Sequence, residues 1–190
     1  MSKKELLIIG GPNGSGKTTF ARSFLNEYKY EFLNADEISR ELTKKGKSAG
    51  SISAGKEYFK RIEKLKLKNK SIILESTLSG LFLKKMIHEF KNKNYLITTI
   101  FVYLNNPEIS IDRIKVRVSK GGHHVPDVDV RRRFERGINN FWKTYRQSAD
   151  NWILVNNSET SFEQVAIKGS KNFEILNEVL FNSFNKLTKK

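Results

Sequence analysis

One glycine-rich motif near the N-terminus constrains this chain more than any other feature. Residues 11–18 read GPNGSGKT and match G-x-x-x-x-G-K-[ST], the pattern of a phosphate-binding loop. An apolar run at 6–9 precedes the motif, and apolar residues at helical spacing follow it at 17–29. Glycines let backbone N–H groups turn inward around phosphates, and the helix N-terminus adds partial positive charge. The motif therefore predicts a strand, a phosphate loop and a helix in direct succession.

The residue types inside the motif predict its ligands. We expect Lys17, at a solvent-facing helix start, to reach the β- and γ-phosphates of ATP, and Thr18 to ligate Mg²⁺. The alternative, a glycine-rich turn that binds nothing, leaves the lysine and the hydroxyl at this spacing unexplained. The expected ATP contacts are Gly11, Pro12, Asn13, Gly14, Ser15, Gly16, Lys17, Thr18 and Thr19.

The rest of the chain alternates between strand and helix patterns. Four further apolar runs predict strands, at 32–33, 71–75, 95–104 and 152–155. Between and after them, helical spacing predicts a helix at 37–45, a basic helix that ends at about 67, and helices at 80–92, 107–118, 127–147 and 171–187. This order favours an α/β fold with a central, mainly parallel five-stranded sheet flanked by helices. A length of 190 residues without a convincing boundary predicts one domain, 1–190.

Two carboxylates follow predicted strands and are candidates for chemistry. Asp36 lies at the end of the second strand, where ligands gather in sheets of this kind, and we expect it to orient an acceptor hydroxyl and take its proton. The alternative is that Asp36 caps the following helix, and the two roles are compatible. Glu75 ends the run SIILE, as acids do near the magnesium ion of phosphate-loop proteins. Ser76 and Thr77 follow it as candidate hydrogen-bond donors to substrate.

A segment rich in glycine, histidine and arginine predicts a lid at about 117–136. Gly121 and Gly122 favour a mobile turn between two helices, with Arg117 before it and Arg131, Arg132 and Arg133 after it. Successive helical residues point about 100° apart, so at most two of the three clustered arginines share one site. His124 is a candidate substrate contact, with an ordinary surface histidine as the alternative. His123 and His124 are too few to predict a metal site.

Charge and composition exclude several classes of protein. The chain has 35 Lys and Arg against 20 Asp and Glu, a net charge of +15, from which we expect weak, sequence-independent binding to nucleic acid. The absence of cysteine excludes disulfides, thiolate catalysis and Cys-ligated metals. Since no apolar run approaches the ~18–20 residues of a membrane span, we expect no membrane association and a cytoplasmic location.

Taken together, four segments resemble the zeta toxin family of P-loop kinases: GPNGSGKTT at 11–19, LNADEISREL at 33–42, ESTLSG at 75–80 and GGHHVPDVDVRRRFERGINNFW at 121–142. The resemblance implies a P-loop kinase fold in which Lys17 and Thr18 contact ATP and Mg²⁺. It further implies that Asp36 is the general base and Glu75 a substrate-side carboxylate. Arg117 and one of Arg132 or Arg133 would neutralise charge.

The family's best-known members phosphorylate the sugar of UDP-N-acetylglucosamine and are held inactive by a small antitoxin. The resemblance thus implies a sugar-nucleotide substrate and an antitoxin partner. We therefore expect an ATP-dependent kinase acting on a hydroxyl of a small anionic molecule. A polynucleotide or nucleoside kinase, and a P-loop ATPase module that is not a kinase, remain as alternatives.

Overall fold

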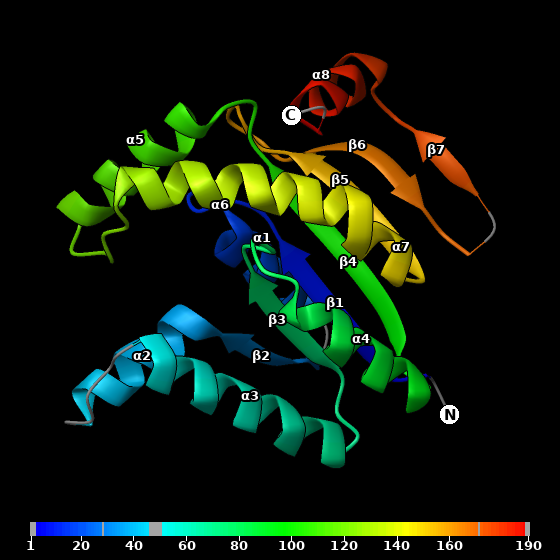
Figure 1. Cartoon of the computed structure of the whole chain (residues 1–190). Helices are drawn as coiled ribbons and strands as arrows, with labels where there is room; N and C mark the ends of the chain where they lie inside the picture. The colour runs from blue at the N-terminus through cyan, green and yellow to red at the C-terminus, as the bar shows by residue number, and fades with distance from the viewer. Residues whose placement is uncertain (1–2, 28, 46–50, 171, 189–190) are drawn as a thin grey trace.

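The centre of the molecule is a seven-stranded sheet, seen in a computed structural model that describes residues 3–27, 29–45, 51–170 and 172–188 (Figure 1). Its strand order is β2-β3-β1-β4-β5-β6-β7. The first five strands are parallel, and β6 and β7 are antiparallel to their neighbours. The strands are β1 (Glu5–Gly10), β2 (Glu31–Asn34), β3 (Ile72–Ser76), β4 (Leu96–Tyr103), β5 (Asn151–Asn156), β6 (Glu163–Lys168) and β7 (Phe173–Ile175).

Helices connect the parallel strands and cover both faces of the sheet. They are α1 (Lys17–Glu27), α2 (Ala35–Lys44), α3 (Ser51–Leu67), α4 (Phe82–Asn92), α5 (Pro107–Ser119), α6 (Asp127–Asn140), α7 (Arg146–Ser148) and α8 (Glu178–Thr188), with a π-helical turn, η1 (Phe141–Tyr145), between α6 and α7. The first helix, expected over 17–29, is observed over Lys17–Glu27; Tyr28 lies outside the described residues, and Lys29 is not helical.

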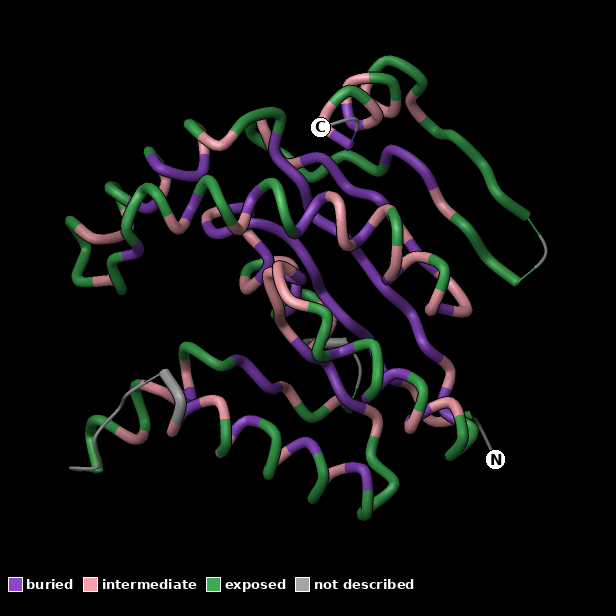
Figure 2. Tube along the Cα trace, viewed as in Figure 1, coloured by how far each residue is buried: buried purple, intermediate pink, exposed green. Residues whose placement is uncertain are grey.

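The buried residues form two main layers, one on each side of the sheet (Figure 2). On one face, apolar side chains of α3, α4, α6 and α8 pack on the strands, with Phe101 of β4 stacked on Phe141 of η1 at 4.5 Å between ring centroids. On the other face, Ala21, Phe20 and Phe24 of α1 pack on the sheet. Burial on both faces explains why β1, β3 and β4 are continuous apolar runs.

The five strands expected from the sequence are all present, and the fold is confirmed. The structure adds β6 and β7, which sequence patterns missed because β6 buries only Val165 and Ala166 and β7 buries none of its three residues. The helix expected from residue 171 begins only at Glu178, because 173–175 pair with β6. The helix expected at 127–147 is interrupted by η1. Among the described residues, no helix is long and apolar enough to cross a membrane.

The register of the parallel strands brings their carboxyl ends to one edge. Glu75 of β3 pairs with Asn34 of β2 on one side and with Ile9 of β1 on the other. The phosphate loop leaves β1 one residue after Ile9, so it begins beside these two polar residues. In open sheets of this type, ligands bind at the carboxyl ends of the strands.

Candidate active site

The phosphate loop has the backbone conformation that its glycines permit. Gly11, Gly14 and Gly16 have positive φ angles, of 146°, 74° and 87°. A Cβ on Gly16 would lie 2.6 Å from the side-chain nitrogen of Asn157, which donates a hydrogen bond to the Ser15 carbonyl at 2.9 Å. The loop after β5 thus holds the phosphate loop from outside, at a distance that admits only glycine.

Lys17 lies inside this loop, which corrects the expectation that it is solvent-facing. Its side chain is only 7% exposed, and Nζ donates to the Pro12 carbonyl at 2.7 Å. Burial lowers the pKa of Lys17, and the carboxylates of Glu75 and Asp36 oppose that effect. Burial removes water from the ammonium group of Lys17 and leaves it few partners for its charge. Phosphate oxygens bound in the loop would supply such partners.

The oxygen atoms beside Lys17 fit a magnesium ion. Thr18 Oγ1 donates to Glu75 Oε2 at 2.9 Å, and Asn34 Nδ2 donates to the same oxygen at 2.6 Å. A hydroxyl and a carboxylate in contact are hard oxygen ligands of the kind that Mg²⁺ takes together with substrate phosphates. Among the described residues, the buried atoms Asn13 Oδ1 and Ser15 Oγ of the loop have no hydrogen-bond partner. A bound polar ligand would supply the hydrogen-bond partners that these two buried atoms lack.

Asp36 is not the cap of α2. That position belongs to Asn34, whose side-chain oxygen accepts from the backbone nitrogens of Asp36 and Glu37, at 2.7 and 3.2 Å. The carboxylate of Asp36 is exposed and lies in the first turn of α2, where the helix dipole favours negative charge. Capping therefore does not account for this residue, and its carboxylate remains available for chemistry.

Two cavities meet at Lys17, Asp36 and Glu75. The first, the phosphate cavity, has a volume of about 280 Å³ and is lined mainly by the phosphate loop together with Arg113 and Arg117 of α5. The second, the acceptor cavity, has a volume of about 310 Å³ and extends away from the loop between α3, α4 and α6. Because three charged residues line both, groups bound in the two cavities would face one another at this point.

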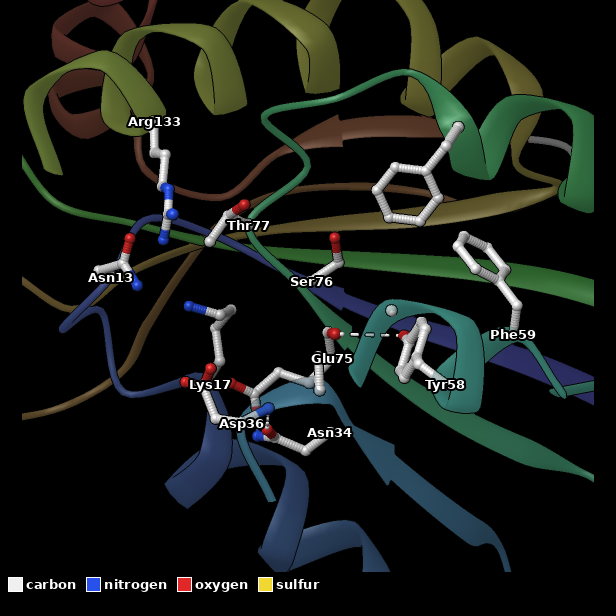
Figure 3. Close-up of a pocket in the computed structure, with 13 residues that line it drawn as sticks. Asn13, Lys17, Asn34, Asp36, Tyr58, Phe59, Glu75, Ser76, Thr77 and Arg133 are labelled. Atoms are coloured by element: carbon white, nitrogen blue, oxygen red, sulfur yellow. Dashed lines mark hydrogen bonds between the residues drawn. The ribbon is translucent and has the colours of Figure 1, made fainter. Parts of the chain in front are cut away.

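The acceptor cavity has a polar end and an aromatic end (Figure 3). Arg133 points from α6 towards Asn13 and Lys17, and Ser76 and Thr77 lie in the middle of the view. Tyr58 and Phe59 of α3 lie at the opposite end. The sequence analysis identified Ser76 and Thr77 but missed the aromatic residues Tyr58, Phe59 and Phe82, because they have the spacing of ordinary core positions and come from two helices.

Helix α6 holds the wall of the acceptor cavity in place. A Cβ on Gly137 would lie 2.6 Å from the Thr77 carbonyl, so the helix and the loop after β3 approach as closely as glycine allows. Asn140 Nδ2 donates to the Leu78 carbonyl at 2.8 Å, and Leu78 has a left-handed φ of 54°. A left-handed conformation is strained for leucine, and it is maintained only where surrounding contacts hold the residue in place.

The clustered arginines separate as helix geometry requires. Arg133 lines the acceptor cavity, whereas Arg131 pairs with Glu108 and Arg132 pairs with Asp129 at 2.6 Å on exposed surface. The candidate role of Arg132 therefore has no support from its position, because residues next to each other on α6 face different directions.

Arg117 lies in the phosphate cavity and is held by the turn that follows α5. Its Nη2 donates to the His123 carbonyl at 2.6 Å, and Gly122 N donates to the Arg117 carbonyl at 2.9 Å. Val125, at the end of the same turn, is buried in a small cluster with Val130, so the turn is anchored at both ends. The side chain of His124 is exposed and lines neither cavity, which places this candidate away from the site.

Arg113 is a residue that the sequence analysis missed. Its guanidinium lines the phosphate cavity and donates to the carbonyls of Gly14, Ser158 and Glu159, at 3.5, 3.3 and 3.1 Å. The available signal was its spacing of four residues before Arg117, which places both arginines on one face of α5.

Comparisons with known proteins identify a family and several relatives with a similar fold. The family model AAA_33, described as an AAA domain, matches residues 6–133. A cytidylate kinase of Archaeoglobus fulgidus is 29% identical over 158 residues, which cover 78% of this chain and 81% of the relative.

Two solved structures share nearly the whole fold at low identity. The AvrRxo1-ORF1:-ORF2 complex with ATP has a TM-score of 0.76 at 18% identity, with 98% of this chain covered. The chain spans only 64% of that protein's length. The PezAT toxin–antitoxin system of Streptococcus pneumoniae has a TM-score of 0.69 at 18% identity, covering 97% of this chain and 78% of the other. At this identity the likeness shows the fold alone.

Proposed function

This chain belongs to the AAA domain family AAA_33 and has the P-loop kinase fold, and from its site we propose that it transfers the γ-phosphoryl group of ATP to a hydroxyl of a small anionic molecule. The observation that carries the proposal is the meeting of two cavities at Lys17, Asp36 and Glu75. A phosphate site alone would serve an ATPase, whereas a second cavity that shares its charged residues supplies a place for an acceptor.

Each residue at the meeting point has a role in this reaction. Lys17, with Arg117 and Arg113, would bind the phosphates from the loop side, and Arg133 would face them from the acceptor side. Thr18 and Glu75 would hold Mg²⁺, which neutralises charge that develops on the β- and γ-phosphates.

Asp36 would accept the proton of the acceptor hydroxyl. The acceptor oxygen then forms a bond to the γ-phosphorus while the bond from that phosphorus to the β–γ bridging oxygen breaks, and ADP leaves. Phosphoryl transfer depends mainly on positioning and charge stabilisation, so an ordinary aspartate suffices as the acceptor of this proton. The segment 117–136 would act as a lid of a single kinase domain spanning 1–190, and Arg117 and Arg133 would reach the phosphates from its two ends.

The resemblance to zeta toxins favours a sugar nucleotide of the UDP-N-acetylglucosamine type as acceptor and an antitoxin as partner. The fold shared with the PezAT toxin–antitoxin system supports only the antitoxin part of that proposal. A nucleoside or nucleotide kinase is the second candidate, favoured by the cytidylate kinase relative and by the net charge of +15.

A panel of acceptors incubated with ATP labelled at the γ-phosphate tests the proposal. UDP-sugars, nucleosides, nucleoside monophosphates and 5′-hydroxyl oligonucleotides separate the candidates by which product carries the label. Asp36→Asn should reduce transfer by about 10²–10⁴-fold, the range for loss of a general base, with ATP affinity nearly unchanged.

Glu37→Gln is the matched control, because Glu37 is the neighbouring acid in the same first turn of α2 but lines neither cavity. We expect it to retain wild-type transfer. Hydrolysis of ATP at an equal rate with and without every acceptor would instead establish an ATPase and overturn the proposal.

A further inference from the structure

The aromatic end of the acceptor cavity has no role in the chemistry described above. Phe59 and Phe82 are 41% and 49% exposed, and their rings pack edge to face with centroids 5.4 Å apart. Tyr58, beside them, is buried, and its hydroxyl donates to the Glu75 carbonyl at 3.4 Å. Large aromatic side chains exposed together at the mouth of a cavity mark a binding surface more often than a packing accident.

A glycine in α3 faces the same part of the cavity. Within the described residues, Gly55 and Gly137 are the glycines that lie inside helices, where glycine is the least favourable residue after proline. Gly137 has a packing reason, since a Cβ there would meet the Thr77 carbonyl. At Gly55, a Cβ would have no atom of the described chain within 4 Å. The described residues therefore give no steric reason for glycine at position 55, and Gly55 lines the acceptor cavity.

The polar end supplies what an alcohol with a negative charge requires. Arg133 and Lys17 are cationic, and the carboxylate of Asp36, the proposed proton acceptor, lines the same cavity. The cavity volume of about 310 Å³ lies near the lower end of the ~300–1,000 Å³ typical of small-molecule sites, which favours a compact acceptor. A compact molecule that matches both ends has a planar ring on one side and a hydroxyl with an anionic group on the other.

We propose that the acceptor is a nucleoside-type alcohol whose planar base lies against Phe59 and Phe82, and that Gly55 is kept small to admit that base. This inference rests on the proposed function, because the second cavity must be the acceptor site. It deepens that function by naming the part of the acceptor that is recognised, a planar base, and the residues that select it.

Binding of probes with and without a base tests the role of the aromatic residues. The four ribonucleoside monophosphates and ribose 5-phosphate all contain a ribose and a phosphate, but only the monophosphates carry a base. Titration by calorimetry, with a non-hydrolysable ATP analogue saturating the phosphate cavity, restricts the probe to the acceptor cavity. We expect at least one monophosphate to bind about 5- to 100-fold more tightly than ribose 5-phosphate, the range that stacking of a base on aromatic rings supports.

Phe59→Leu should reduce that preference to less than about threefold and leave binding of ribose 5-phosphate unchanged. Phe173→Leu is the matched control, because Phe173 is 51% exposed in β7 and lines neither cavity. Equal affinity of ribose 5-phosphate and all four monophosphates for the wild-type protein would overturn the inference.

Gly55→Ala and Gly55→Leu test whether Gly55 is kept small to admit the base. Two quantities, the melting temperature and the affinity for monophosphates, should change in opposite directions. Alanine and leucine are better helix residues, so the melting temperature should rise or hold. Monophosphate binding should weaken, by about tenfold or more for leucine, while binding of the ATP analogue is unchanged. A raised melting temperature with unchanged monophosphate binding would show that Gly55 selects nothing.

The outcomes separate this inference from the proposed function. ATP-dependent labelling of an acceptor without a planar ring, such as a sugar phosphate, would overturn the inference and leave the kinase intact. Base-selective binding without phosphoryl transfer to any acceptor would overturn the kinase and leave the aromatic site intact.

Discussion

The phosphate cavity and the acceptor cavity share three charged residues and are built in opposite ways. The first is formed mostly by one continuous stretch of chain, between residues 13 and 19. The second is assembled from side chains of α1, β2, α2, α3, β3, α4 and α6 and of adjoining loops. Backbone groups in one tight loop recognise a phosphate whatever carries it, whereas side chains from many elements recognise the rest of a particular molecule. In the proposed reaction, the phosphate cavity would therefore accept any nucleoside triphosphate, and the second cavity would decide which acceptor is used.

The two regions are also stabilised differently. The phosphate loop is held from outside by Asn157 and Arg113, which bind its backbone carbonyls. The wall of the acceptor cavity is held by α6, through Gly137 and Asn140. Changes to α6 should therefore alter use of the acceptor, and changes around α5 should alter use of ATP.

The largest effect is expected at Lys17, which lines both cavities. Lys17→Met removes the charge and keeps the length of the side chain, so phosphoryl transfer should fall by at least about 10²–10³-fold, as for loss of one electrostatic stabiliser of a transition state. Because the buried ammonium is desolvated, the melting temperature should hold or rise. Turnover and thermal unfolding measured on the same preparation check this. Wild-type turnover would remove Lys17 from the site.

An intermediate loss of turnover is expected at Arg133 of α6 but not at its neighbour Arg132. Arg133→Lys keeps the charge but loses the planar fork, and should lower turnover by roughly 10–1,000-fold, below the ~10³–10⁵ of a complete arginine finger. ATP affinity should change little, because Arg133 lines only the acceptor cavity. Arg132→Lys is the control, since Arg132 pairs with Asp129 on exposed surface. Equal loss in both variants would contradict the assignment.

The smallest effect should come from the turn that holds Arg117. A Cβ on Gly122 would lie 2.5 Å from Arg117 Cγ and 2.8 Å from its carbonyl oxygen, so Gly122→Ala must displace the arginine. We expect turnover to fall by about tenfold, less than the ~10²-fold that a 1 Å misplacement can cause. Affinity for the acceptor should be unchanged in Gly122→Ala, whereas it should change in Arg133→Lys.

Gly169→Ala is the control for this variant, because no described atom lies within 4 Å of a Cβ at that position. Alanine substitution of His123 should also leave turnover unchanged, since only its backbone carbonyl holds Arg117. A loss on removal of the His123 side chain would mean that the imidazole itself acts at the site.

Some features depend on a neighbouring residue or strand. Capping of the helix was the alternative role for Asp36, because Asp36 follows a strand, but Asn34 lies two residues earlier and takes that role. The strands β6 and β7 have few buried residues of their own, and they form because β5 offers a free edge. The spacing of residues along the chain does not indicate that such an edge is available for pairing.

The sequence by itself determined the phosphate loop, the order of strands and helices through β5, and the presence of Asp36 and Glu75 at the ends of strands. Those features follow from backbone conformation and apolar spacing over a few neighbouring residues, which any chain with these residues must satisfy. Only the tertiary structure decided that Arg133 rather than Arg132 faces the acceptor cavity, that Arg113 joins Arg117, and that Phe59 meets Phe82. Which side chains meet depends on how separate helices pack on the sheet, and packing is a property of the whole core.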